Sequence, residues 1–133
     1  MMQPSDVRLH RKTAVLELVY ADGSSLALPA EFLRVHSPSA EVRGHGPGQE
    51  VLQTGKRHVK IDSIDPVGHY ALKLHFDDGH DTGIYSWDYL RELALQQKTL
   101  WNHYLERLQA AGARREPPES GVQVVNIMPL KPR

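Results

Sequence analysis

The chain has 133 residues with 16 basic and 16 acidic side chains, and it contains no cysteine. This length predicts one domain with its own apolar core. The zero formal net charge excludes a whole-molecule field that attracts nucleic acid or anionic lipid. The lack of cysteine excludes disulfides, thiolate metal sites and cysteine nucleophiles. No apolar run approaches the roughly 20 residues of a membrane span, and residues 1–11 lack the apolar stretch of a secretory signal. We therefore expect a soluble cytoplasmic protein without a membrane or nucleic-acid partner.

A β-hairpin followed by a short helix is predicted over residues 13–34. Apolar side chains alternate along the outgoing strand, at Ala14, Leu16, Leu18 and Tyr20. Asp22-Gly23 reads as a tight turn, because Asp-Gly tolerates the positive φ that short hairpin loops require. Leu26 and Leu28 continue the period of two on the returning strand. Pro29 then ends the strand and begins the helix.

The same pattern returns 56 residues later, as the offset between Asp22 and Asp78 shows. Leu72, Leu74 and Phe76 alternate, Asp78-Gly79 forms the turn, and a helix carries Tyr89-Leu90-Arg91 where the first unit carries Phe32-Leu33-Arg34. Two such units favour an α+β fold, with an antiparallel sheet built from two repeated β-hairpin–helix units and short helices packed on an apolar face.

Other elements complete the predicted domain, which we bound at residues 1–112. The segment 37–48 is too rich in Gly and Pro for a regular element, and Val59 to Ile64 suggest a further strand that stops near Pro66. Apolar residues at helical spacing predict an amphipathic helix over 98–111, ended by Gly112. Residues 113–133 form a flexible or partner-docking tail, in which 122–128 adds an edge strand or docks on a partner.

The Gly-rich loop from Arg43 to Gly48 is the first candidate site. Backbone N–H groups of such a loop can point at an anion, and basic side chains lie near it in sequence: Arg43, His45, Lys56 and Arg57. The loop lacks the Gly-Lys-Ser/Thr of a P-loop and the spacing of a dinucleotide fingerprint. The alternative is a long connector whose glycines only permit turning.

Histidines and aromatic residues supply the other candidates. His36, His45 and His80 are the candidate metal ligands, although helical His-x-x-x-His spacing is absent; the alternative is scattered surface histidines. No nucleophile-elbow motif surrounds a serine, and Ser86 is better explained as a helix N-cap. Trp101 and Tyr104 are candidates for a partner surface, with core packing as the alternative.

Several of these segments together resemble a known family. Residues 33–42, Gly44-His45-Gly46-Pro47, Asp78-Gly79-His80 and residues 85–90 are similar to the gamma-butyrobetaine hydroxylase-like N-terminal domain family, over about residues 9–108. In the family's eukaryotic hydroxylases, the domain that this chain resembles precedes a separate iron- and 2-oxoglutarate-dependent catalytic domain. The domain of those hydroxylases holds a structural zinc through three cysteines and one histidine, so the resemblance implies a zinc site. The matching positions here are Ser37, Ser39, Val42 and His80.

These observations lead to one functional hypothesis and two rivals. Valine cannot coordinate zinc and a serine hydroxyl is a poor ligand beside a thiolate, so we expect no cofactor. The resemblance extends to domains attached to Mrp-type P-loop proteins that carry iron–sulfur clusters. We therefore expect a stand-alone bacterial-type member: a non-catalytic binding or docking module, accessory to metal-cofactor or oxygenase systems, whose partner is a protein or a second copy. The rivals are a metal-binding protein that uses its histidines and a small-anion-binding enzyme.

Overall fold

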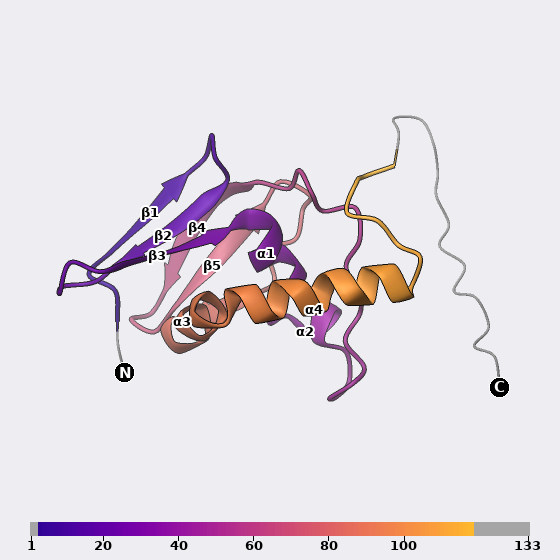
Figure 1. The fold of residues 1–133 in the computed structure, drawn as a ribbon. Helices are drawn as coiled ribbons and strands as arrows, with labels where there is room; N and C mark the ends of the chain where they lie inside the picture. Colours follow the sequence, from indigo (N-terminus) through magenta and orange to yellow (C-terminus); the bar gives the residue numbers. More distant parts are fainter. Residues whose placement is uncertain (1–2, 119–133) are drawn as a thin grey trace.

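The computed structural model describes residues 3–118 of the chain (Figure 1). Its elements, in chain order, are the strands β1 (Asp6–His10), β2 (Val15–Val19) and β3 (Ser25–Pro29), the helices α1 (Ala30–Val35) and α2 (Ala40–Arg43), the strands β4 (Ile61–Val67), β5 (Ala71–Phe76) and β6 (Ile84–Ser86), and the helices α3 (Trp87–Leu95) and α4 (Gln97–Ala110). The predicted α+β class is confirmed. None of the helices within residues 3–118 has the length and apolar character needed to cross a membrane.

The strands pair in two antiparallel sheets of three strands each, in the orders β1-β2-β3 and β4-β5-β6. The sequence predicted one sheet. It divides because each hairpin takes its third strand from the segment just before it, so β1 pairs with β2 and β4 pairs with β5. The repeated unit is therefore β-β-β-α. β1 was not predicted, and β4 runs through Pro66, which an edge strand tolerates because its free side needs no N–H donor.

The two hairpin turns have equivalent backbone hydrogen bonds. The Tyr20 amide donates to the Ser24 carbonyl at 2.9 Å in the first turn, and the Phe76 amide donates to the His80 carbonyl at 3.1 Å in the second. Gly23 and Gly79 both have a φ of 88°, the left-handed region that a side chain rarely adopts. The predicted Asp-Gly turns and the repeat are thus present in the structure.

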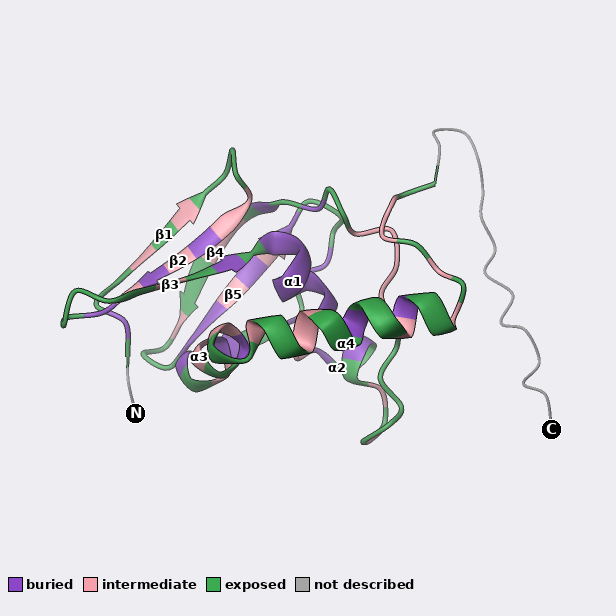
Figure 2. Ribbon diagram, viewed as in Figure 1, coloured by how far each residue is buried: buried purple, intermediate pink, exposed green. Residues whose placement is uncertain are grey.

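Both sheets bury their apolar faces in one core (Figure 2). Inward-facing residues of β2, β5 and β6 lie there with residues of α1 and α3, among them Leu16, Leu18, Leu33, Leu74, Tyr85 and Leu90, all fully buried. Alternation with a period of two places these side chains on one face of each strand. The two sheets therefore share one core, as expected of a single domain.

The two long helices begin and end where local sequence predicts. The Ser86 side chain accepts a hydrogen bond from the Tyr89 amide at 3.1 Å, which confirms the predicted N-cap of α3. α4 ends in a Schellman motif: the Ala113 amide donates to the Leu108 carbonyl at 2.9 Å, and Gly112 has a φ of 62°. The helix predicted over 98–111 is thereby confirmed. In contrast, α2 is one helical turn within the segment predicted to be irregular.

Residues 113–118, the start of the predicted tail, pack against the domain. The Arg114 carbonyl accepts from the Gly55 amide at 2.9 Å, and the Arg115 guanidinium binds both carboxylate oxygens of Glu31 at 2.7 and 2.8 Å. Arg115 also lies 5.0 Å above the Trp101 ring. The strand or docking segment predicted at 122–128 lies outside the described residues.

Candidate binding pocket and the polar cluster behind it

A pocket of about 520 Å³ opens where α1, α2 and the Gly-rich loop meet α3 and α4. We call it the α1–α2 pocket. Its wall combines apolar side chains with basic and aromatic ones, including Val35, Val42, Arg43, Val51, Tyr89 and Arg107. The loop contributes residues 44–47, among them His45. A concave site of this size, largely apolar with a few polar groups, is typical of small-ligand binding.

Arg43 is held in the pocket wall by an aromatic ring. Its guanidinium lies 5.1 Å from the centroid of the Tyr89 ring, a favourable cation–π arrangement. Tyr89 is fixed in turn, since its hydroxyl donates to the His36 carbonyl at 2.6 Å. Burial raises the pKa of Tyr89, while the neighbouring Arg43 opposes that rise. The Arg43 guanidinium is thus positioned at the pocket surface.

His36 and Arg107 complete the polar part of the wall. His36 Nδ1 donates to the Phe32 carbonyl at 2.9 Å, which leaves Nε2 as the ring nitrogen without a protein partner among residues 3–118. Burial is the main cause that lowers the pKa of His36, so its ring is neutral near pH 7. Arg107 donates to the Glu50 carbonyl at 3.4 Å, a long hydrogen bond that leaves its other N–H groups available.

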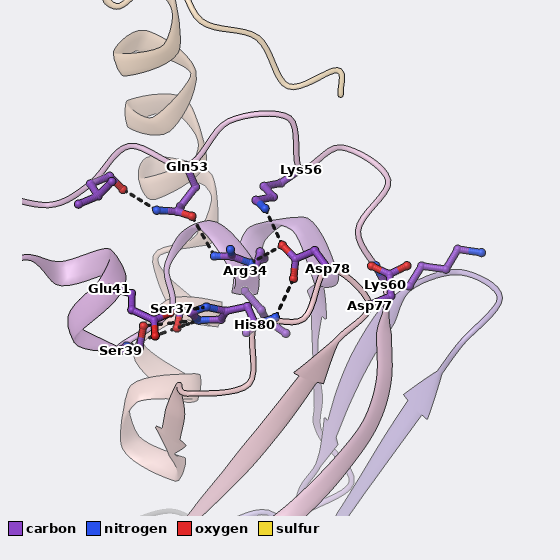
Figure 3. A network of polar contacts seen from close by, with 12 residues as sticks. Arg34, Ser37, Ser39, Glu41, Gln53, Lys56, Lys60, Asp77, Asp78 and His80 are labelled. Carbon is purple, nitrogen blue, oxygen red and sulfur yellow. Dashed lines mark hydrogen bonds and ion pairs between the residues drawn. The ribbon is translucent and has the colours of Figure 1, made fainter. Parts of the chain in front are cut away.

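Behind the pocket lies a buried polar cluster built around His80, which we call the His80 cluster (Figure 3). His80 Nε2 lies 2.8 Å from Ser37 Oγ and 3.5 Å from Ser39 Oγ. On the other side of the ring, Nδ1 lies 3.2 Å from a carboxylate oxygen of Glu41. With its Nδ1–H directed at Glu41, the ring accepts a hydrogen bond from Ser37 through Nε2. Burial is the main cause that lowers the pKa of His80.

The serine, histidine and glutamate of this cluster have the order of a hydrolase triad, but the serine is enclosed. Ser37 is 1% exposed. Gly83 covers its hydroxyl so closely that a Cβ at residue 83 would lie 2.5 Å from Ser37 Oγ. A nucleophile must approach its substrate to within about 3–3.5 Å. The cluster therefore links the second hairpin turn to the α1–α2 segment and does not present a nucleophile.

The zinc that the resemblance implies does not fit these residues. Three matching positions do come together, because Ser37, Ser39 and His80 are in contact. However, the two hydroxyls are engaged with the imidazole, and the buried Val42 offers only methyl groups. Among residues 3–118, no group of three or more His, Asp or Glu side chains is placed to hold a metal ion. The candidate ligands His36 and His45 line the pocket, whereas His80 does not.

Lys56, one of the basic residues predicted near the loop, lies outside the pocket in an ion-pair network with Asp78 (Figure 3). Its Nζ is 2.6 Å from Asp78, whose same carboxylate oxygen is 2.8 Å from Arg34 Nε. Burial alone raises the pKa of Asp78. Hydrogen bonds from Lys56, from the His80 amide and from Arg34 outweigh that effect and lower it to about 2. Arg57 pairs with Glu116 at 2.7 Å. Of the predicted anion-loop residues, only Arg43 and His45 therefore line the pocket.

The two aromatic residues predicted as a partner surface are packed inside the domain. Tyr104 is 3% exposed, and its hydroxyl donates to the Gln53 carbonyl at 2.7 Å. Trp101 is half-buried against Phe32 and Tyr104, with ring centroids at 6.4 and 5.2 Å. The physical reason is that α4 turns its aromatic face toward α1, so core packing, the alternative, accounts for the position of both residues.

Sequence reasoning assigned no site role to Glu41, Tyr89 or Arg107, which belong to α2, α3 and α4. Glu41 and Tyr89 fall within the family segments 33–42 and 85–90, whereas Arg107 lies in no motif. The nearest available signal was the Arg43-to-Gly48 motif itself, which identified one wall of the pocket.

The fold and these sites can be compared with known proteins. Residues 7–91 match the family described as "Gamma-butyrobetaine hydroxylase-like, N-terminal". The chain belongs to this family. No curated protein sequence matches it, so the family assignment comes without a curated relative whose activity could be compared.

Solved structures similar to the chain include two NMR solution structures. One is 53% identical, with a TM-score of 0.77, over 93% of this chain and 98% of that one. The other is 49% identical, with a TM-score of 0.75, over 94% of each chain. A third, a crystal structure of a protein of unknown function in the DUF971 family from Acidithiobacillus ferrooxidans, is 43% identical with a TM-score of 0.58. That match covers 69% of this chain and 92% of the other. Each of the three matches covers at least 92% of the solved chain, so the likeness extends over nearly all of those chains.

Proposed function

We propose that this chain is a non-catalytic binding module that holds its ligand in the α1–α2 pocket. The pocket itself carries the proposal: about 520 Å³ of space, with Arg43 presented on Tyr89 and with Arg107 on the opposite helix. Binding needs only such a shaped surface with a few fixed polar groups.

The chemistry around the pocket favours binding over turnover. A serine nucleophile would have to come from Ser37, which Gly83 covers. His36, the half-buried imidazole of the wall, donates through Nδ1 to a backbone carbonyl and keeps Nε2 free, but Ser37 is the only serine among the described residues that line the pocket. The resemblance to domains joined to oxygenases and to Mrp-type proteins supports an accessory role, in which the module serves a reaction performed by another domain or protein.

NMR titration of the full 133-residue chain tests this function. The isotope-labelled protein is mixed in turn with short-chain carboxylates, 2-oxoglutarate, inorganic phosphate and a neutral amide. Amide shifts of the protein and the proton spectrum of each compound are followed together. We expect saturable shifts at the residues lining the pocket for at least one compound, which itself remains unchanged. Conversion of any compound by the pure protein would overturn the non-catalytic function.

A filled-pocket variant gives the matched control. Val51 lines the pocket and is 52% exposed, so Val51→Trp adds an indole at the mouth without entering the core. Tyr70 is 56% exposed and does not line the pocket, which makes Tyr70→Trp the equivalent change elsewhere. Val51→Trp should abolish the shifts and Tyr70→Trp should preserve them. Equal behaviour of the two variants would place binding on another surface.

A further inference from the structure

The α1–α2 pocket holds two guanidinium groups that form no ion pair with a carboxylate of residues 3–118. Neither Arg43 nor Arg107 forms an ion pair within that part of the chain, whereas Arg34, Arg57 and Arg115 each do. The Arg43 guanidinium lies over the Tyr89 ring, and Arg107 donates a single long hydrogen bond to the Glu50 carbonyl. Arginine presents five N–H donors in a planar fork that matches a carboxylate or phosphate. Most of these donors have no partner among the residues that the structure describes.

The charge of the wall selects among anions. Two arginines and one acidic residue, Glu50, give the lining a formal charge of +1 with histidines left uncounted. The Glu50 carboxylate accepts from the Gly48 amide at 3.3 Å and does not pair with either arginine. A single excess positive charge balances a monoanion, whereas a phosphate carries about 1.5 to 2 negative charges at neutral pH.

The rest of the wall indicates what is attached to that anion. Val35, Val42 and Val51 provide branched aliphatic surface, and Pro47 and the Tyr89 ring add flat apolar surface. Contact with such a wall stabilises an apolar body by about 25 cal/mol per Å² removed from water. A fully polar anion such as phosphate would leave this apolar surface in contact with water.

We propose that the α1–α2 pocket binds a carboxylate group carried on a short branched apolar body, with the carboxylate held between Arg43 and Arg107. This rests on the proposed binding function and specifies its ligand class. Two sources share the chemistry: a free small carboxylic acid and the C-terminal carboxylate of a peptide that ends in an aliphatic residue. In both cases the arginines bind the charge and the valines contact the aliphatic group.

Calorimetric and NMR titration of the full chain with four probes tests the assignment. The probes are isovalerate as the free acid, N-acetylvaline as a chain end, isovaleramide as the neutral analogue and inorganic phosphate as the polar dianion. The protein variants are Arg43→Gln and Arg107→Gln, with Arg57→Gln as control because Arg57 is an ion-paired arginine outside the pocket. All three side chains lie outside the buried core, and a dispersed amide spectrum checks the fold of each variant.

We expect one of the two carboxylate probes to bind at the pocket and isovaleramide to bind at least about tenfold more weakly, as expected when charge-assisted hydrogen bonds are lost. Arg43→Gln and Arg107→Gln should each weaken the carboxylate at least about tenfold, and Arg57→Gln should leave it unchanged. Tighter binding of isovalerate identifies a free acid, and tighter binding of N-acetylvaline identifies a chain end.

Four results overturn the assignment. Equal binding of acid and amide, or unchanged affinity in both pocket variants, refutes carboxylate recognition but leaves a binding pocket in place. Tighter binding of phosphate refutes the apolar monoanion. If no probe shifts the amide signals of the pocket residues, the ligand class is refuted. The NMR titration of the proposed function, with its wider set of compounds and the Val51→Trp variant, then decides separately whether the pocket binds a ligand.

Discussion

Replacing Asp78 by Asn tests the network that joins the second hairpin turn to α1. Asp78 accepts from Arg34, which is only 8% exposed, and from Lys56, while its own side chain is 22% exposed. Removing one partner of a fully buried ion pair costs about 3–5 kcal/mol, because a charge is left uncompensated. Here water reaches Asp78, and Gln53 still accepts from Arg34 at 3.0 Å. We therefore expect Asp78→Asn to lower the free energy of unfolding by about 2 kcal/mol.

The assay is urea unfolding, and the repeat supplies its control. A loss of this size corresponds to a fall of about 1 M in the urea midpoint at a typical slope for a small domain. Asp22 occupies the same turn position in the first unit and accepts from the Ser24 amide at 2.9 Å, but it forms no ion pair within residues 3–118. Asparagine keeps the turn hydrogen bond in both cases, so Asp22→Asn should change the midpoint far less. Equal losses in the two variants would show that the ion pairs contribute nothing.

Acid titration provides a second prediction from the same carboxyl group. Its pKa is lowered from 3.8 to about 2, so the unfolded state binds protons more readily than the folded state in this range. The sign follows: the stabilisation is fully present above about pH 4 and is lost as the pH falls toward 2. The shift is equivalent to about 2 kcal/mol, reduced to about 1–2 kcal/mol by solvent screening of the partly exposed group. Wild-type stability should fall over this interval more steeply than that of Asp78→Asn, and parallel curves would contradict the assignment.

Two further substitutions test the cap of α3 and the cover of Ser37. Ser86→Ala removes the acceptor of the Tyr89 amide and should lower the free energy of unfolding by about 1 kcal/mol, measured by thermal or urea unfolding; no loss would mean that water caps the helix equally well. Gly83→Ala places a Cβ 2.5 Å from Ser37 Oγ and should cost about 1–3 kcal/mol through overpacking. Gly46→Ala enters open space and is the matched control, so similar stabilities for the two variants would contradict the packing argument.

What could be predicted from the sequence is the part that neighbouring residues determine. Asp-Gly turns, the Ser86 cap and the Gly112 end of α4 each depend on a few consecutive residues, and all are present in the structure. The alternation along β2 and β5 identified core residues for the same reason. The division into two sheets was not predictable in this way, because it depends on which segment pairs with each hairpin. β1 carries only two apolar residues, Val7 and Leu9, which is too short a pattern to distinguish from a polar terminus.

The candidate site was predicted in part, and the missing part has a physical cause. The Gly-rich loop and three of the four family positions lie in one continuous segment, so the sequence identified Arg43, His45, Ser37 and Ser39 together. Tyr89 and Arg107 reach the pocket only because α3 and α4 fold back across α1. Sequence proximity also misled, since Lys56 is close to the loop along the chain but is bound to Asp78.

The pocket and the His80 cluster share one residue, and this connects the family's metal position to the proposed ligand site. Ser37 lines the pocket and also bonds to His80 at 2.8 Å. In the first repeat the residue after Asp-Gly is Ser24, which bonds only within its own turn; in the second it is His80, which reaches across to the α1–α2 segment. The turns share one backbone, so it is the side chains of the second turn, Asp78 and His80, that link this hairpin to the α1–α2 segment. Hydrogen bonds between His80 and this segment thus help to position the chain that carries Arg43.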